Sequence, residues 1–156
     1  MTNIHYEIGD AADPVGNGRK FIIHVCNNIG KWGEGFTESL SSRWVLPERQ
    51  YRLEHSFFGR LHMGDIQIVQ VCEDTYVLNM ISQQGVWYSG RKDIPLRYDE
   101  LSECLSKVSR AANNIGASIH MPRIGCGLAG GKWEKVVRLV EKHLTGLEVH
   151  VYDPIN

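Results

Sequence analysis

Residues 121–133 read Met121-Pro122-Arg123-Ile124-Gly125-Cys126-Gly127-Leu128-Ala129-Gly130-Gly131-Lys132-Trp133. This stretch follows a short apolar segment and precedes an amphipathic one, so it predicts a loop between a strand and a helix. Glycines allow the backbone to approach a phosphate closely, and the next helix N-terminus offers free N–H groups at the positive end of its dipole. A tight turn with one packing glycine would not need four glycines within seven residues. The stretch therefore predicts a phosphate-binding loop.

The spacing of the glycines narrows the kind of phosphate loop. A Walker A loop is excluded, because Cys126 occupies the place of its first glycine and Trp133 the place of its Ser or Thr. Gly125, Gly127 and Gly130 do match GxGxxG. A Rossmann fold usually opens with that loop, however, and here only one predicted helix and one predicted strand follow it. The pattern favours diphosphate binding but not a Rossmann fold.

A second glycine-rich segment, residues 27–36, follows the continuous apolar run 21–26 and leads into a predicted helix. It repeats the order of strand, glycine loop and helix N-terminus. Two such loops at the same edge of one sheet would hold a diphosphate from both sides. Asn27 and Asn28 begin the segment, and they are also common turn residues.

The remaining pattern predicts one α/β domain over residues 1–156, since no linker, repeat or low-complexity tract is visible. Ile4, Tyr6 and Ile8 alternate like a half-buried strand. Further strands are expected at 21–26, 66–71, 76–81, 117–121 and 147–152, and helices at 35–45, 47–58, 97–115 and 132–144. Six strands interleaved with helices predict a three-layer α/β/α fold around a mixed, mostly parallel sheet.

Composition limits the class of protein and its partners. Apolar residues make up 42% and charged residues 22% of the chain, as in soluble globular proteins. A net charge of -1 argues against broad nucleic-acid binding. No signal peptide or membrane-spanning stretch is visible, so a cytoplasmic protein with no membrane partner is expected. The four cysteines are widely spaced without a CxxC pair, and neither a metal nor another cofactor is expected.

The chain resembles the macro domain family through three features in the family's order. These are Gly9-Asp10 after the first strand, the Asn- and Gly-containing loop after the second, and the string 122–131 before the last helix. The likeness covers nearly the whole chain. Met-Pro-Arg-Ile-Gly-x-Gly makes it most similar to the subgroup of terminal ADP-ribose protein glycohydrolase and yeast-type ADP-ribose 1''-phosphate phosphatase.

The resemblance implies that the ligand is ADP-ribose or a derivative, and that ADP-ribosylated macromolecules are partners. It implies that Asp10 binds the adenine amino group, although a turn or cap role also fits, and that Asn27 faces the distal ribose. Tyr152 would lie near the adenine, or would be a surface aromatic. The expected ligand-binding residues are Asp10, Asn28, Gly33, Gly35, Phe36, Ile124, Gly125, Cys126, Gly127, Leu128 and Tyr152. The hydrolytic relatives carry Gly-Gly-Val where this chain has residues 34–36.

The resemblance weakens at the catalytic groups. The glycohydrolase branch uses a lysine after the fourth strand and an aspartate in the second glycine loop. This chain has Gln83 or Gln84 and Ala129 at these places, and spacing does not assign the role to Lys92. Neither an amide nor an alanine serves as a nucleophile or proton carrier, so a lysyl intermediate is not expected.

Catalysis by a positioned water remains open, with Asn27, Glu34 and Gln83 as candidate catalytic residues. Glu34 also fits a simple solvated loop carboxylate. Hydrolysis of an ADP-ribose derivative is therefore one hypothesis, and a non-catalytic ADP-ribose reader is the other.

Aromatic and histidine residues leave further alternatives. Loop 85–93 has glycines near both ends, and its Trp87 or Tyr88 either closes over a ligand or packs on the core. Trp32 has the same two interpretations. His24 and His120 lie in apolar strands and are expected to be hydrogen-bonded core residues, whereas His62 is expected to be exposed.

Overall fold

The computed structural model describes residues 3–155 and contains the predicted elements in the predicted order. Along the chain they are β1 (Asn3–Ile8), β2 (Lys20–Asn27), α1 (Phe36–Arg43), α2 (Leu46–Phe58), β3 (Ile66–Gln70), β4 (Thr75–Gln83), α3 (Tyr98–Ile115), β5 (Ser118–Met121), α4 (Trp133–His143) and β6 (Glu148–Asp153). Pro47 lies in the first turn of α2, and Gly116 ends α3 in the left-handed conformation, as the sequence indicates.

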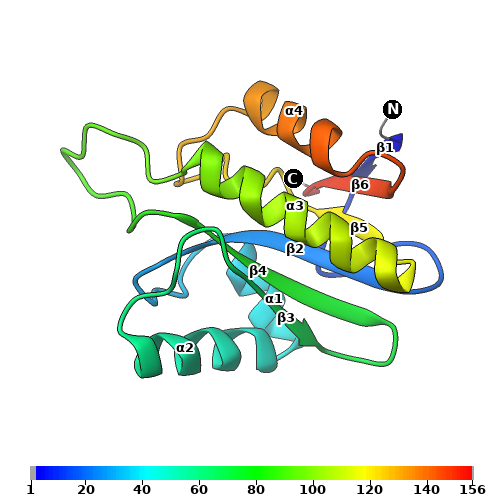
Figure 1. Cartoon of the computed structure of the whole chain (residues 1–156), viewed down its shortest axis with the longest axis horizontal. Helices are drawn as coiled ribbons and strands as arrows, with labels where there is room; N and C mark the ends of the chain where they lie inside the picture. The colour runs from blue at the N-terminus through cyan, green and yellow to red at the C-terminus, as the bar shows by residue number, and fades with distance from the viewer. Residues whose placement is uncertain (1–2, 156) are drawn as a thin grey trace.

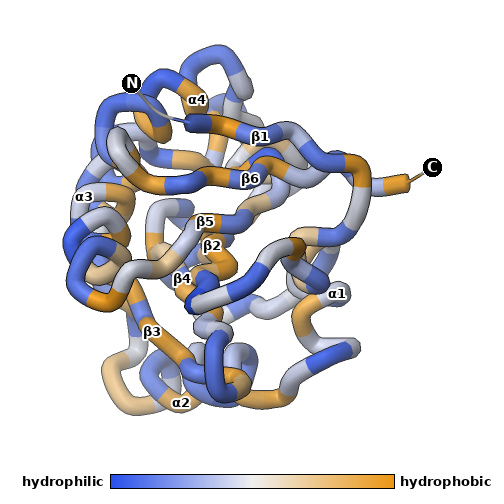
Figure 2. Tube along the Cα trace, turned by 90° about the vertical axis from the view of Figure 1, so that its right-hand side faces the viewer, coloured by the Kyte–Doolittle hydropathy of each residue, from blue (hydrophilic) through white to orange (hydrophobic). Residues whose placement is uncertain are grey.

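The six strands form one sheet in the order β1-β6-β5-β2-β4-β3. Figure 2 shows the strands one above another in this order. All neighbouring pairs are parallel except the β3–β4 hairpin. The mixed, mostly parallel sheet is confirmed. Because β2, β4 and β5 run in the same direction, their carboxyl ends lie at one edge.

Helices cover both faces of the sheet, which gives the three layers visible in Figure 1. On one face α3 and α4 bury a core that includes Ile23, Leu101 and Val149. On the other face α1 and α2 cover a smaller core around Ile22 and Tyr51. The central strand β2 is consequently buried on both sides, as its apolar run predicts. No helix within residues 3–155 has the length and apolarity to cross a membrane.

The edge strand β1 differs from the prediction. Only Ile4 packs against the core, whereas Tyr6 is 52% and Ile8 75% exposed. The alternation of apolar residues correctly indicated a strand, but β1 pairs with β6 alone at the margin of the sheet. Alternating apolar residues indicate a pleated strand, but whether their side chains are buried also depends on what packs over that strand.

Candidate functional site

The two glycine-rich segments lie on the same edge of the sheet and line one pocket of about 630 Å³. One segment follows β2 and the other follows β5, and the loop after β4 adds a third wall. In Figure 1 these loops gather at the left end of the sheet. The lining residues are His24, Val25, Cys26, Asn27, Lys31, Trp32, Gly33, Glu34, Gly35, Phe36, Thr37, Gln83, Val86, Trp87, Pro122, Arg123, Ile124, Gly125, Gly127, Leu128 and Ala129.

The first glycine loop ends at the N-terminus of α1, which no side chain caps. Gly35 has φ 82° and ψ -129°, a conformation that residues with a side chain rarely adopt. Among residues 3–155, the amides of Gly35, Phe36 and Thr37 donate to no acceptor of the protein. Glu38 N–H donates back to the Gly35 carbonyl at 3.0 Å. The loop therefore presents free N–H groups at the positive end of a helix dipole.

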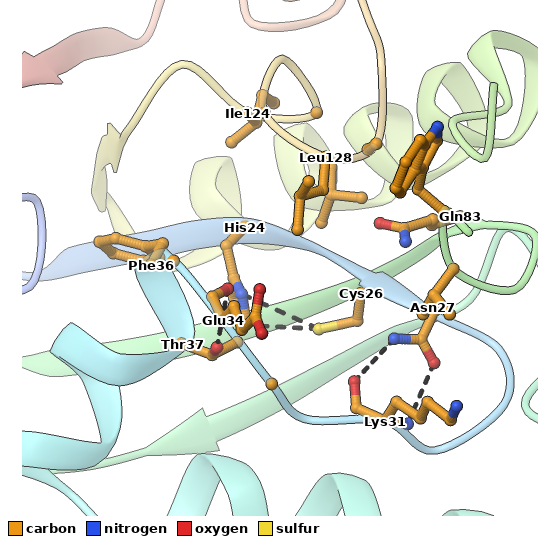
Figure 3. A pocket seen from close by; sticks show the side chains of 18 of the residues that line it. His24, Cys26, Asn27, Lys31, Glu34, Phe36, Thr37, Gln83, Ile124 and Leu128 are labelled. Atoms are coloured by element: carbon orange, nitrogen blue, oxygen red, sulfur yellow. Dashed lines mark hydrogen bonds between the residues drawn. The ribbon is translucent and has the colours of Figure 1, made fainter. Parts of the chain in front are cut away.

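The Asn27 side chain organises this loop. Its Oδ1 accepts the amides of Ile29 and Lys31, both at 3.1 Å, and its Nδ2 donates to the Lys31 carbonyl at 2.7 Å. Tyr51 Oη lies 2.6 Å from the Asn27 carbonyl oxygen and 2.8 Å from Oδ1. Figure 3 shows the bonds between Asn27 and Lys31. The turn role that the sequence left open for Asn27 is thus present, although Asn27 also lines the pocket.

Asn28 joins two loops and does not line the pocket. Its Oδ1 accepts the Gly85 amide at 2.9 Å, and its Nδ2 donates to Gln84 Oε1 at 3.3 Å. The side chain is buried in these contacts. Asn28 therefore joins the first glycine loop to the loop after β4, and its contact with a ligand stays a prediction.

The second glycine loop closes on itself and leaves other amides free. Gly131 N–H donates to the Gly125 carbonyl at 2.7 Å, and Gly130 N–H to the Gly127 carbonyl at 3.0 Å. Within the described chain, no acceptor pairs with the amides of Gly125, Gly127 or Leu128. Successive unpaired N–H groups of this kind form an anion-binding concavity.

Two residues expected at the adenine lie outside the pocket lining. Asp10 Oδ1 accepts the Ala12 amide at 2.9 Å, which is the turn role considered for it. Tyr152 is buried, so the surface interpretation is wrong. Its Oη accepts the Val15 amide at 2.9 Å and lies 2.8 Å from Nδ1 of His120. Cys126, also expected at the ligand, is not among the lining residues, and its Sγ donates to the Ile124 carbonyl at 3.3 Å.

The ionisable groups at the pocket are held neutral, except those on its exposed rim. Burial lowers the pKa of His24 to about 4, and its Nε2 lies 2.6 Å from Asn79 Oδ1. Burial raises the pKa of the Cys26 thiol well above its ordinary value. Glu34 and Lys31 are exposed. The buried part of the pocket therefore offers no thiolate nucleophile.

The structure shows where the residues lie that replace the catalytic groups expected from the resemblance. Gln83 lines the pocket, whereas Gln84 points to Asn28. Gln83 Nε2 donates to the Gly85 carbonyl at 3.0 Å, and no donor within residues 3–155 pairs with its Oε1. Ala129 also lines the pocket. The residues that the resemblance matched to the charged groups of the glycohydrolase branch are therefore neutral, and Gln83 and Ala129 line the pocket.

Of the loop aromatics, Trp32 belongs to the core and also lines the pocket, Trp87 lines the pocket, and Tyr88 does neither. Trp32 is 9% exposed, packs on Tyr51 and donates from Nε1 to Ser41 Oγ at 2.8 Å. Trp87 is 51% and Tyr88 61% exposed, so neither ring packs on the core. Trp87 lines the pocket together with Val86.

The histidine predictions are confirmed. His24 and His120 are buried and hydrogen-bonded, and His62 is exposed. Sequence reasoning assigned no role to Lys31, Thr37 or Val86. Lys31 lies inside the first glycine loop and Val86 inside loop 85–93, so these two positions were the available signals.

Comparisons with known proteins agree on the fold. No protein-family model matches the chain. A macrodomain protein from Streptomyces coelicolor is 41% identical, with a TM-score of 0.84 over 97% of this chain and 99% of that one. A protein of unknown function from Bacteroides thetaiotaomicron is also 41% identical, with a TM-score of 0.93 over 99% of both chains. Thermosipho africanus DarTG, solved in complex with ADP-ribose, is 18% identical, with a TM-score of 0.72 over 97% of this chain and 42% of that one.

Two of the curated relatives with functional names illustrate the range of the likeness. Chromodomain-helicase-DNA-binding protein 1-like of Danio rerio is 31% identical over 97% of this chain, but the chain spans only 16% of that protein. ADP-ribose 1''-phosphate phosphatase of Saccharomyces cerevisiae is 25% identical over 97% of this chain and 99% of its own length. Each of these two alignments extends over 97% of this chain.

Proposed function

Since this chain belongs to the macro domain family, we propose that it binds ADP-ribose between its two glycine loops and hydrolyses an ADP-ribose derivative. One observation carries the proposal: unpaired backbone amides stand on two walls of a single pocket. Backbone N–H groups bind a diphosphate without any net positive charge, which fits a chain of net charge -1. The names of the yeast phosphatase and of the ADP-ribose complex support the same ligand.

The two ends of the pocket differ in chemistry and give the ligand a direction. Figure 3 shows Phe36 and Ile124 at one end and Gln83 and Asn27 at the other. We expect the adenosine at the apolar end and the distal ribose near Gln83. The diphosphate then lies between the amides of Gly35 and Phe36 and those of Gly127 and Leu128. Asp10 Oδ2 remains available to the adenine amino group.

Hydrolysis in this site would use water as the nucleophile. The bond between the distal ribose and its 1'' substituent breaks. The hydroxyl group of the water remains on the ribose, and the substituent leaves with the other proton. Gln83 Oε1 is free to accept a hydrogen bond from that water, and Glu34 is a carboxylate on the same pocket. The free amides of the loops would stabilise charge on the phosphate oxygens. Asn27 contributes less in this scheme, because its amide holds the loop.

A non-catalytic reader is the second candidate, and one observation favours it. Gln83 and Ala129 line the pocket where the glycohydrolase branch has its lysine and aspartate. Such a pocket binds ADP-ribose on its own or on an ADP-ribosylated macromolecule without turning it over. Binding is common to both candidates, so turnover separates them.

Titration calorimetry with ADP-ribose, AMP and ribose 5-phosphate tests the shared part of the proposal. ADP-ribose should bind at least about tenfold more tightly than either fragment, because only it engages both loops and both ends of the pocket. Equal affinities for the three ligands would reject the two-loop site.

Turnover is then measured with ADP-ribose 1''-phosphate and with an ADP-ribosylated peptide. Release of phosphate or ADP-ribose that is lost in a Gln83→Ala variant supports hydrolysis. Binding without release from either compound supports the reader.

A further inference from the structure

Arg91 is an unusual residue of the loop between β4 and α3, because its charged side chain is only 9% exposed. The base of this loop is fixed to the rest of the protein. Gln84 N–H donates to the Pro95 carbonyl at 2.8 Å, and Gly85 N–H donates to Asn28 Oδ1 at 2.9 Å. The tip, residues 86–92, projects from the sheet edge at the left of Figure 1.

The Arg91 guanidinium joins the two arms of the tip. One nitrogen donates to the Val86 carbonyl at 2.9 Å, and Nε donates to Asp93 Oδ1 at 2.9 Å. Asp93 Oδ2 accepts from Arg97 at 2.8 Å, so the second arm is anchored at the start of α3. The guanidinium carbon also lies 5.8 Å from the centre of the Tyr88 ring. Between the two guanidinium groups, the pKa of the Asp93 carboxyl is held far below its ordinary value.

The arm that Arg91 holds is the one that reaches the pocket. Val86 and Trp87 line the pocket, and the Val86 carbonyl is the acceptor of Arg91. Within the described chain, one hydrogen bond joins backbone groups inside the tip: Arg91 N–H donates to the Tyr88 carbonyl at 3.0 Å. Without the guanidinium, the position of Trp87 would depend on that turn and on the hydrogen bonds of Gln84 and Gly85 at the base of the loop.

We propose that Arg91 is a positioning residue that holds Trp87 at the mouth of the pocket, where the indole packs on the distal ribose. This rests on the proposed function. A half-exposed indole offers a large apolar surface to the CH groups of a sugar, and a wall ordered before binding spares the ligand the entropy of ordering it. The tip is therefore a formed wall of the site, held by a single buried cation.

The test compares Arg91→Ala and Arg91→Lys with Arg19→Ala, which removes an exposed hydrogen bond to the Ile115 carbonyl before the amino end of β2, away from the pocket. In both Arg91 variants the affinity for ADP-ribose should fall about tenfold, because an ammonium group cannot reproduce the fork that reaches both Val86 and Asp93. The affinity for AMP, which lacks the distal ribose, should stay within about twofold. Arg19→Ala should change neither affinity. An equal loss for AMP and ADP-ribose overturns the positioning role.

A double-mutant cycle separates Trp87 from other effects of Arg91. Trp87→Ala should weaken ADP-ribose binding about as much as Arg91→Ala, and the double variant should be no weaker than either single variant. Additive losses would show that Arg91 acts through something other than the indole.

A ligand-free measurement keeps the inference distinct from the proposed function. Acrylamide quenching of Trp87, taken as the difference between proteins with and without Trp87→Phe, should increase in Arg91→Ala. Unchanged quenching overturns the role of Arg91. Failure of the unaltered chain to bind ADP-ribose overturns the proposed function and the ribose contact, whatever the quenching result.

Discussion

At the scale of single residues, the glycines of the second loop have different tasks. A Cβ at Gly125 would lie 2.9 Å from Leu96 Cδ2, and the φ of Gly125 is +72°, so both space and backbone require glycine there. At Gly127 no atom lies within 4 Å of a Cβ, and φ is not in the left-handed region. Gly127 therefore keeps the pocket open, whereas Gly125 serves the fold.

The open space at Gly127 allows a test of ligand binding that leaves the fold intact. Gly127→Glu should abolish ADP-ribose binding, because its carboxylate would fill the diphosphate site and repel it. Gly127→Gln, of the same length without the charge, should bind more tightly than the Glu variant. Calorimetry measures both, and thermal midpoints within about 2 °C of the unaltered chain confirm folding. Equal affinities of the two variants would contradict an anion site.

Two buried histidines predict how stability depends on pH. Burial lowers the pKa of His24 to about 4 and, with help from His150 and Lys20, that of His120 to about 3, against 6.5 when unfolded. As the pH falls, the unfolded chain is protonated at these histidines before the folded chain is. Their contribution to stability is therefore fully present above about pH 6.5 and is lost as the pH falls from there to the folded pKa values. When the pH falls from 7 to 5, each histidine should lower the free energy of unfolding by about 2 kcal/mol.

Urea unfolding at the two pH values measures this cost. His24→Gln keeps a donor for Asn79 but does not titrate, so it should lose about 2 kcal/mol less than the unaltered chain. The same loss in both proteins would mean that His24 is protonated in the folded state.

At the scale of elements, α2 holds the first glycine loop chiefly through the Tyr51 hydroxyl group, beside longer bonds from Arg52 to the carbonyls of Gly30 and Trp32. Tyr51 is buried, and its Oη contacts both oxygens of Asn27. Tyr51→Phe should cost about 1–2 kcal/mol of unfolding free energy and weaken ADP-ribose binding several-fold, because Asn27 loses a donor. Tyr76→Phe, a partly buried ring of β4 beside Phe21, is the matched control. Unfolding and calorimetry should show no change for it, and equal effects in both variants would argue against a special role of Tyr51.

Helices and strands could be predicted because the spacing of apolar residues along the sequence differs between the two. Leu101, Leu105 and Val108 recur at helical spacing and are fully buried under the sheet. The conformations of the loops could not be predicted in the same way. Asn27 bonds locally to Ile29 and Lys31, as a turn residue does, but its contact with Tyr51 joins residues 24 positions apart, and no local pattern encodes that contact. The bonds of Asn28 to Gln84 and Gly85 likewise join residues 56 and 57 positions apart.

At the scale of the whole molecule, the topology brought the predicted site together. Loops 27–36 and 122–131 are nearly a hundred positions apart, yet β2 and β5 are adjacent and parallel. Ligands bind at the carboxyl ends of the strands in such sheets. The sequence therefore predicted which segments meet. It could not predict that Asp10 would lie outside the pocket lining, because that depends on how the edge strand β1 and its turn are placed.

Simultaneous engagement of both loops is a property of the assembled site, and NMR of the ¹⁵N-labelled chain can observe it. ADP-ribose should produce large amide shifts at Gly35 and Phe36 and also at Gly127 and Leu128, because these N–H groups lack acceptors in the described structure. Gly116, whose N–H already donates to the Ala112 carbonyl at the far end of α3, should not shift. AMP, with one phosphate, should shift both groups less. Shifts confined to one loop would leave the other without a role in binding, and the diphosphate would then be held from a single side.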